Sequence, residues 1–149
     1  MDVFDLIVIG GGAAGLVTAS GAAQLGAKVA LIEKDKLGGE CLWTGCVPSK
    51  ALVEAGRTKR RIDLAQKAGF DLGEVKVDFA RVMAHVHEII MRIEPHDNPE
   101  HFRKMGITVI HGTARFTGHN TVDVHGEVLT GRRFWLAAGG RVVCQAIEG

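Results

Sequence analysis

The feature that most restricts the fold is a run of glycines between two apolar stretches. Residues Gly10-Gly11-Gly12-Ala13-Ala14-Gly15 fit the motif G-x-G-x-x-G. Phe4 to Ile9, before the motif, is a short apolar run with β-branched residues, which is typical of a strand covered on both faces of a parallel sheet. Leu16 to Leu25, after it, is rich in alanine and leucine and predicts a helix. This order of strand, glycine motif and helix predicts a dinucleotide-binding unit.

An acidic residue completes this unit. Gly26 is suited to end the helix, Lys28 to Ile32 predict the second strand, and Glu33 follows about 20 residues after the glycines. A helix N-terminus attracts a pyrophosphate, and a carboxylate at this position accepts hydrogen bonds from ribose hydroxyls. A 2′-phosphate would clash with Glu33, so the ligand is expected to be NAD-like or FAD-like rather than NADP. The alternative is a glycine-rich turn beside an ordinary surface glutamate.

Two cysteines form the second informative pattern. Cys41 and Cys46 are five positions apart, which in a regular helix is about 7.5 Å along the axis, whereas the Cα atoms of a disulfide are usually about 4.4–6.8 Å apart. Pairing therefore needs a bent or interrupted turn. Gly45 tolerates unusual backbone angles, and Pro48 prevents a continuous helix but suits a first turn. Lys50 and a nearby helix start should favour a thiolate. The alternatives are two unrelated buried cysteines or a disulfide with a purely structural role.

Composition limits the class of protein. The chain has 149 residues, 46% of them hydrophobic and 23% charged, which predicts one globular domain over residues 1–149. The net charge of +1 does not indicate nucleic-acid binding. Leu6 to Ala27 is uncharged, but its six glycines are clustered, so a strand, a turn and a helix explain it better than a membrane span. Three cysteines and the lack of a secretory leader predict the cytoplasm, where disulfides are more often catalytic than structural.

The middle of the chain predicts helices. Ala51 to Ala68 is expected to form one long helix, and Asp78 to cap a second, amphipathic one that runs from Phe79 to Ile93 and ends at Pro95. The histidines show no clean ligand spacing, so no metal site is predicted.

From Met105 the hydrophobic period changes to two. Four short strands are expected to form a small sheet or meander, at Ile107 to Ile110, Thr113 to Phe116, Thr121 to Val124 and Glu127 to Thr130. Arg133 to Ala137 is expected to return to the main sheet, and Cys144 to be an unpaired thiol. The predicted fold class is therefore α/β, a doubly wound, Rossmann-like parallel sheet with a small antiparallel meander.

Together these motifs resemble a known family. Val8 to Gly15, Glu33 and, above all, Gly38 to Lys50 are similar to the N-terminal FAD-binding portion of the class I flavin-dependent pyridine nucleotide-disulfide oxidoreductases, which include dihydrolipoamide dehydrogenase, glutathione reductase and mercuric reductase. The Leu42-Trp43-Thr44 insert and Ile93 to Asp97 look most like the mercuric-reductase-like branch. A dihydrolipoamide-type enzyme is the alternative within the family.

The resemblance implies FAD as cofactor and a role for each residue of the cysteine motif. Cys41 would be the interchange thiol that meets the substrate, Cys46 the thiol that faces the flavin, and Lys50 the cation near the reactive ring. Family members usually carry threonine in place of Glu40, whose carboxylate would oppose a thiolate at Cys41. The implied cofactor-binding residues are Gly10, Gly12, Ala13, Ala14, Gly15, Glu33, Lys34, Gly39, Glu40, Gly45, Gly112, Thr113, Ala114, Ala138 and Gly139.

The resemblance also implies a reaction. Electrons would pass from NAD(P)H through FAD to a Cys41–Cys46 disulfide and on to substrate. The partner implied is a disulfide, dihydrolipoyl or mercuric-ion substrate. The chain ends at Gly149, where relatives are about a third complete, and lacks the second glycine motif and the C-terminal interface domain through which the complete enzymes form homodimers. Full turnover by this chain alone is therefore not expected. A nucleotide-binding or redox-sensing module without turnover, or a fragment that folds without cofactor, are the alternatives.

Overall fold

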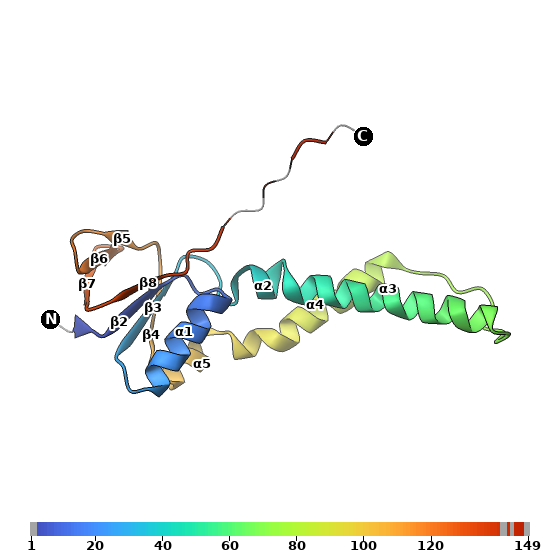
Figure 1. Ribbon diagram of the computed structural model, residues 1–149, viewed down its shortest axis with the longest axis horizontal. Coiled ribbons are helices and arrows are strands. Elements are labelled where there is room, and N and C mark those ends of the chain that lie inside the picture. Colours follow the sequence, from blue (N-terminus) through green and yellow to red (C-terminus); the bar gives the residue numbers. More distant parts are fainter. Residues whose placement is uncertain (1–2, 141–142, 144, 148–149) are drawn as a thin grey trace. The chain divides into compact units, whose positions relative to one another are not determined.

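The computed structural model describes residues 3–140, 143 and 145–147. They fall into two compact units. One is made of residues 3–37 and the described residues from 102 onward, and the other of residues 38–101 (Figure 1). The second unit is thus inserted into the chain of the first. Cys144, predicted to be an unpaired thiol, lies outside the described residues.

A four-stranded parallel sheet forms the centre of the first unit. Its order is β4 (Thr108–His111), β3 (Val29–Glu33), β2 (Leu6–Ile9) and β8 (Phe134–Leu136). All three neighbouring pairs are parallel. This confirms the predicted parallel sheet and the return of the chain to it near residue 134.

The position of β4 corrects one prediction. Ile107 to Ile110 was expected in the antiparallel meander, but β4 pairs with β3 instead, with Ile32 opposite Ile110. The preceding helix α5 (Pro99–Lys104) leads the chain into β4 parallel to β3. A short apolar run does not specify its partner strand, so its sequence pattern could not distinguish the two sheets.

The predicted strand from Phe4 to Ile9 is also interrupted. It splits at Asp5 into β1 (Val3–Phe4), which pairs with β7 (Glu127–Gly131), and β2. The carboxylate of Asp5 accepts hydrogen bonds from the backbone N–H of Lys28 at 2.9 Å and from Arg132 Nη1 at 3.0 Å. These bonds hold the chain where it passes from one sheet to the other.

The second sheet has the order β1-β7-β6-β5, with β6 at Thr121–Val124 and β5 at Arg115–Phe116. Its β5–β6 and β6–β7 pairs are antiparallel, which confirms the predicted meander.

The two faces of the parallel sheet are covered differently. Helix α1 (Ala13–Gln24) and α5 pack on one face, where Leu16 and Phe102 join Val8 and Leu31 in a buried cluster. On the other face, the small sheet rather than helices covers the core. Its residues Phe4, Val122, Val124 and Leu129 pack against Ile7 and Ile32 of the parallel sheet. The predicted doubly wound sheet would have helices on both faces. Among the described residues, helices cover only one face.

The inserted unit is a helical hairpin. Its elements are α2 (Gly39–Trp43), α3 (Cys46–Lys67), α4 (Phe79–Ile93) and a 3₁₀ turn, η1 (Glu94–His96). In Figure 1, α3 and α4 run side by side. Leu42 of α2 and Val86 and Ile90 of α4 form a buried cluster, and partly buried residues of α3, among them Val47 and Leu52, pack against it. Asp78 caps α4 as predicted, because its side chain accepts a hydrogen bond from the N–H of Arg81 at 3.2 Å.

Helix α3 begins earlier than predicted. Its first residue is Cys46 rather than Ala51. Pro48 fits into the first turn because no backbone N–H there needs an intrahelical partner. Among the described residues, no helix is long and apolar enough to cross a membrane.

Candidate cofactor and dithiol sites

The ends of four parallel strands bring distant segments together in the first unit. Gly10 follows β2, Glu33 ends β3, Gly112 follows β4 and Ala137 follows β8. The backbone hydrogen bonds that join these ends run from Gly10 N–H to Ile32 O, from Gly112 N–H to Glu33 O and from Ala137 N–H to Ile9 O, each 2.8 Å long. The carboxyl edge of a parallel sheet is where ligands of such folds bind.

The side chain of Glu33 is held at this edge by two backbone donors. Its Oε2 accepts a hydrogen bond from Gly11 N–H at 2.6 Å, and its Oε1 accepts one from Asp35 N–H at 2.8 Å. Each carboxylate oxygen keeps further acceptor capacity for a ligand hydroxyl. Gly11 was not among the predicted site residues, since the motif leaves its position unspecified; the run of three glycines was the available signal.

The glycine loop lies directly against its neighbours. A Cβ on Gly10 would stand 2.1 Å from the carbonyl oxygen of Ala137, and one on Gly15 would stand 1.8 Å from the carbonyl oxygen of Gly10. Gly10 also has φ +108°, a conformation that L residues with side chains rarely adopt. The glycines of the motif are therefore required by close packing against the neighbouring backbone.

The start of α1 suits an anion. Its N-cap residue is Gly12, no side chain caps it, and its first turn holds no acidic residue. Ala13 and Ala14 are exposed, so small side chains surround the first backbone N–H groups. These groups have no intrahelical partner and carry partial positive charge. A pyrophosphate would be well placed there.

The other predicted cofactor residues of this unit lie on the segments that follow the strands. Gly112 is buried, with space for a Cβ blocked by Val124 and the ring of His125. The remaining ones are exposed or half-buried, namely Lys34, Thr113, Ala114, Ala138 and Gly139. These predicted cofactor-binding residues all belong to the first unit.

The cysteines lie on either side of a break between two helices in the inserted unit. Cys41 is in α2 and Cys46 begins α3. Between them the N–H of Gly45 donates to the carbonyl of Glu40, and a Cβ on Gly45 would stand 2.9 Å from that oxygen. The predicted interrupted turn is confirmed, and a residue without Cβ is required at its tightest point.

Both thiols are reduced in this structure, with Cys41 half-buried and Cys46 exposed. A hydrogen bond between the two side chains is the largest cause that raises the pKa of Cys41, followed by desolvation. The charge of Cys46 and that of Asp97 raise this pKa further, whereas Lys50 lowers it. The expectation of a favoured thiolate is therefore wrong for Cys41, although Lys50 acts in the predicted direction.

Asp97 also contributes to this shift, although no motif singled it out from the sequence. It is half-buried, and it is the carboxylate that raises the pKa of Cys41, whereas Glu40 is exposed. Burial raises the pKa of Asp97 itself, and the charges of His96 and His101 lower it. Only its position in the segment Ile93 to Asp97 had been noted, because nothing local relates residue 97 to residue 41.

The predicted residues therefore form two groups. Those of the inserted unit are Gly39, Glu40, Cys41, Gly45, Cys46 and Lys50, and all the others belong to the first unit. Within the described part of the chain, no group of three or more acidic, histidine or cysteine side chains could hold a metal ion.

Comparisons with known proteins define the class of this chain. Residues 4–149 match the family described as pyridine nucleotide-disulphide oxidoreductase, and the chain belongs to this family.

Three of the similar proteins are each matched over only part of their own length. The chain is 32% identical to a mercuric reductase of Bacillus cereus over 146 residues, covering 98% of this chain and 23% of that protein. It is 32% identical to a dihydrolipoyl dehydrogenase of Acholeplasma laidlawii, covering 98% of this chain and 44% of that protein. The HOCl-induced flavoprotein disulfide reductase RclA of Escherichia coli has a similar fold, with a TM-score of 0.74 and 29% identity over 98% of this chain and 30% of that one. The chain thus spans less than half of each relative.

Proposed function

We propose that this chain is the FAD-binding part of a flavoprotein disulfide reductase, with Cys41 and Cys46 as its redox-active pair. The observation that carries this proposal is the fixed carboxylate of Glu33, bonded to Gly11 at 2.6 Å beside an uncapped helix start. Family membership and the likeness to a flavoprotein disulfide reductase support it.

The residues present fit the adenosine half of FAD. The first turn of α1 would hold the pyrophosphate, and the free acceptor sites of Glu33 would hold ribose hydroxyls. The adenine would lie by Gly112, Thr113 and Ala114, and Ala138 and Gly139 would border the cofactor at the next strand. When bound, FAD would take a hydride from NAD(P)H and deliver two electrons to a disulfide.

The thiol pair would carry those two electrons onward. Two electrons and two protons convert the Cys41–Cys46 disulfide into two thiols, and these reduce the substrate as the disulfide forms again. Cys41 would meet the substrate, Cys46 would face the flavin, and Lys50 would supply positive charge near them. Relatives named mercuric reductase and dihydrolipoyl dehydrogenase support two kinds of substrate. A mercuric-ion or disulfide substrate would be reduced by the thiol pair. A dihydrolipoyl substrate would instead be oxidised, with its two electrons passing to the Cys41–Cys46 disulfide in the reverse direction. The complete enzyme is proposed to be a cytoplasmic homodimer that binds neither nucleic acid nor membrane.

Binding experiments test the cofactor assignment directly. Titration of purified protein with FAD, followed by flavin fluorescence, should give saturable binding. ADP should compete, because the proposed contacts of the first unit are with the adenosine half, whereas riboflavin should not. Absence of saturable FAD binding, or competition by riboflavin but not by ADP, would contradict the proposed function.

A further inference from the structure

A leucine side chain lies against the glycine that holds the carboxylate of Glu33. If Gly11 carried a Cβ, that atom would stand 2.3 Å from Cδ2 of Leu37 and 3.1 and 3.2 Å from Cβ and Cγ of Glu33. The methyl group of Leu37 therefore occupies the space where a side chain at position 11 would begin. The same glycine donates its N–H to Oε2 of Glu33 at 2.6 Å. Leu37 and Glu33 thus both contact Gly11.

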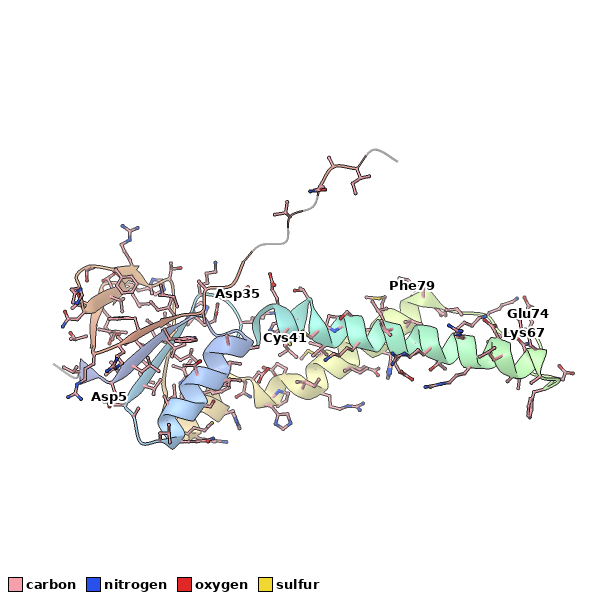
Figure 2. The ribbon with its side chains drawn as sticks, viewed as in Figure 1. Asp5, Asp35, Cys41, Lys67, Glu74 and Phe79 are labelled. Carbon is pink, nitrogen blue, oxygen red and sulfur yellow. The ribbon has the colours of Figure 1, made fainter. Side chains whose placement is uncertain are left out.

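The loop after β3 brings Leu37 back to the glycine loop. The N–H of Asp35, which is labelled in Figure 2, donates to Oε1 of Glu33 at 2.8 Å within a bend of the chain. Leu37 then joins Val8 and Leu16 in the buried cluster on the α1 side of the parallel sheet, and only 6% of it is exposed. The loop is therefore fixed by hydrogen bonds at Glu33 and by packing at Leu37.

We propose that Leu37 is a positioning residue of the nucleotide site, whose side chain holds the backbone of Gly11 against Glu33 and so fixes the direction of the Glu33 carboxylate. The inference rests on the proposed function for the role of Glu33 in binding a ribose. It adds a residue that lies outside the glycine motif and that has no polar side-chain atom with which to bind a ligand.

Packing can have this effect because Gly11 has no side chain to fix its own position. Glycine has more backbone freedom than any other residue, so neighbouring atoms must restrict the direction of its N–H. Removal of a buried side chain leaves a cavity into which the surrounding structure partly relaxes. Without the Leu37 side chain, the peptide of Gly11 is free to move away from Glu33. A binding group that loses its supporting packing also loses its precise orientation, so the Glu33 carboxylate would hold a ribose less well.

The Leu37→Ala variant tests this role against a matched control. Leu129 is also 6% exposed, but it lies in the cluster between the two sheets. Each substitution removes the same buried atoms, so both should lower the urea midpoint of unfolding. Only Leu37→Ala should weaken ADP binding, by about threefold to tenfold, the change that corresponds to loss of one hydrogen bond. Calorimetric titration of the folded proteins measures this affinity.

The amide of Gly11 gives a second measurement that needs no nucleotide. A hydrogen bond from an amide to a carboxylate is short and strong, and it shifts the amide proton resonance downfield. In ¹H–¹⁵N correlation spectra, the Gly11 resonance should move upfield in Leu37→Ala and in Glu33→Ala, and it should stay in place in Leu129→Ala. Leu37→Met nearly conserves the side-chain volume, so it should keep both the resonance and the ADP affinity of the unaltered protein.

The close approach of residues 11 and 37 provides an independent test. The φ of Gly11 lies outside the left-handed region, so alanine meets no backbone strain there. Gly11→Ala should nevertheless weaken ADP binding, because its Cβ would meet Cδ2 of Leu37. In the Leu37→Ala background this methyl group is gone, and the next contacts are those of 3.1 and 3.2 Å with Glu33. The same substitution should therefore reduce ADP affinity by a smaller factor in that background.

These measurements can each overturn the inference. If folded Leu37→Ala has the ADP affinity and the Gly11 resonance of Leu129→Ala, then Leu37 is a core residue only. Equal effects of Gly11→Ala in the two backgrounds would also contradict the proposed role. If Leu37→Ala does not fold, Leu37→Val replaces it in every comparison, with smaller effects of the same sign. Failure of the unaltered protein to bind ADP would count against the proposed function, whereas the Gly11 resonance would still decide the role of Leu37.

Discussion

The carboxylate of Glu33 and the backbone N–H of Gly11 are joined by a 2.6 Å hydrogen bond across 22 positions of sequence. The bond connects the acidic end of β3 to the glycine loop after β2, so the two parts of the nucleotide motif form one structural element. The N–H of Gly112 donates to the backbone carbonyl of the same glutamate at 2.8 Å. The segment after β4 is therefore bonded to the same end of β3.

The variant Glu33→Ala should weaken ADP and FAD binding by about 1–3 kcal/mol, as expected for loss of a charged hydrogen-bonding partner. Calorimetric titration with ADP would measure this change. Glu33→Gln keeps an acceptor oxygen but loses the charge and should have an intermediate effect. Glu127→Gln, on an exposed strand residue, is the control. Equal ADP affinity of Glu33→Ala and the unaltered protein would remove Glu33 from the site.

Two glycines of α1 offer a matched pair of substitutions. A Cβ on Gly15 would stand 1.8 Å from the carbonyl oxygen of Gly10, whereas one on Gly21 meets nothing within 4 Å. Gly15→Ala should lower the free energy of unfolding by about 1–3 kcal/mol or more, as overpacking does. Gly21→Ala should raise it by about 0.5–1 kcal/mol, because alanine favours the helix. Urea denaturation measures both, and equal effects would contradict the close packing.

Oxidation should join Cys41 and Cys46, because their side chains already interact in the reduced protein. Thiol titration of the unfolded chain should find three thiols after reduction, one for each cysteine. After mild oxidation it should find only one, at Cys144. Cys46→Ser is the control, since it should prevent rapid formation of an intramolecular bond. Three thiols after oxidation of the unaltered chain would count against the pairing.

Asp97 should give the fold a distinctive pH dependence. Burial raises its pKa in the folded protein above the value in the unfolded chain, so the folded state binds more protons between these two pKa values. The stability contributed by Asp97 is therefore present below the unfolded pKa and is lost as pH rises through the folded pKa. Asp97→Asn should raise the melting temperature at pH 7 and have less effect near pH 3. Thermal unfolding at both pH values measures this difference, and a lower melting temperature at pH 7 would refute the prediction.

Local sequence signals predicted much of the fold. The cap at Asp78, the helix end at Gly26 and the break between Cys41 and Cys46 each depend on residues close together in the chain. Gly26 has φ +86°, and the N–H of Ala27 donates to the carbonyl of Ala22 at 3.1 Å, as in a glycine-ended helix. Such features can be read from a few neighbouring residues because their hydrogen bonds span only a few positions.

Contacts between distant residues decided the remaining features. Asp5 interrupts the first strand because it binds Lys28 and Arg132, and β4 joins the parallel sheet because it finds β3 as its partner. The segments that carry Cys41 and Cys46 lie against α4 because Leu42 and Val47 pack with Ile90 in one cluster. Hydrophobic periodicity shows which side of an element is buried but does not specify its partner. The motifs of this chain could therefore be recognised from the sequence alone. The environment of its thiols depends on how the helices pack, which the sequence pattern does not specify.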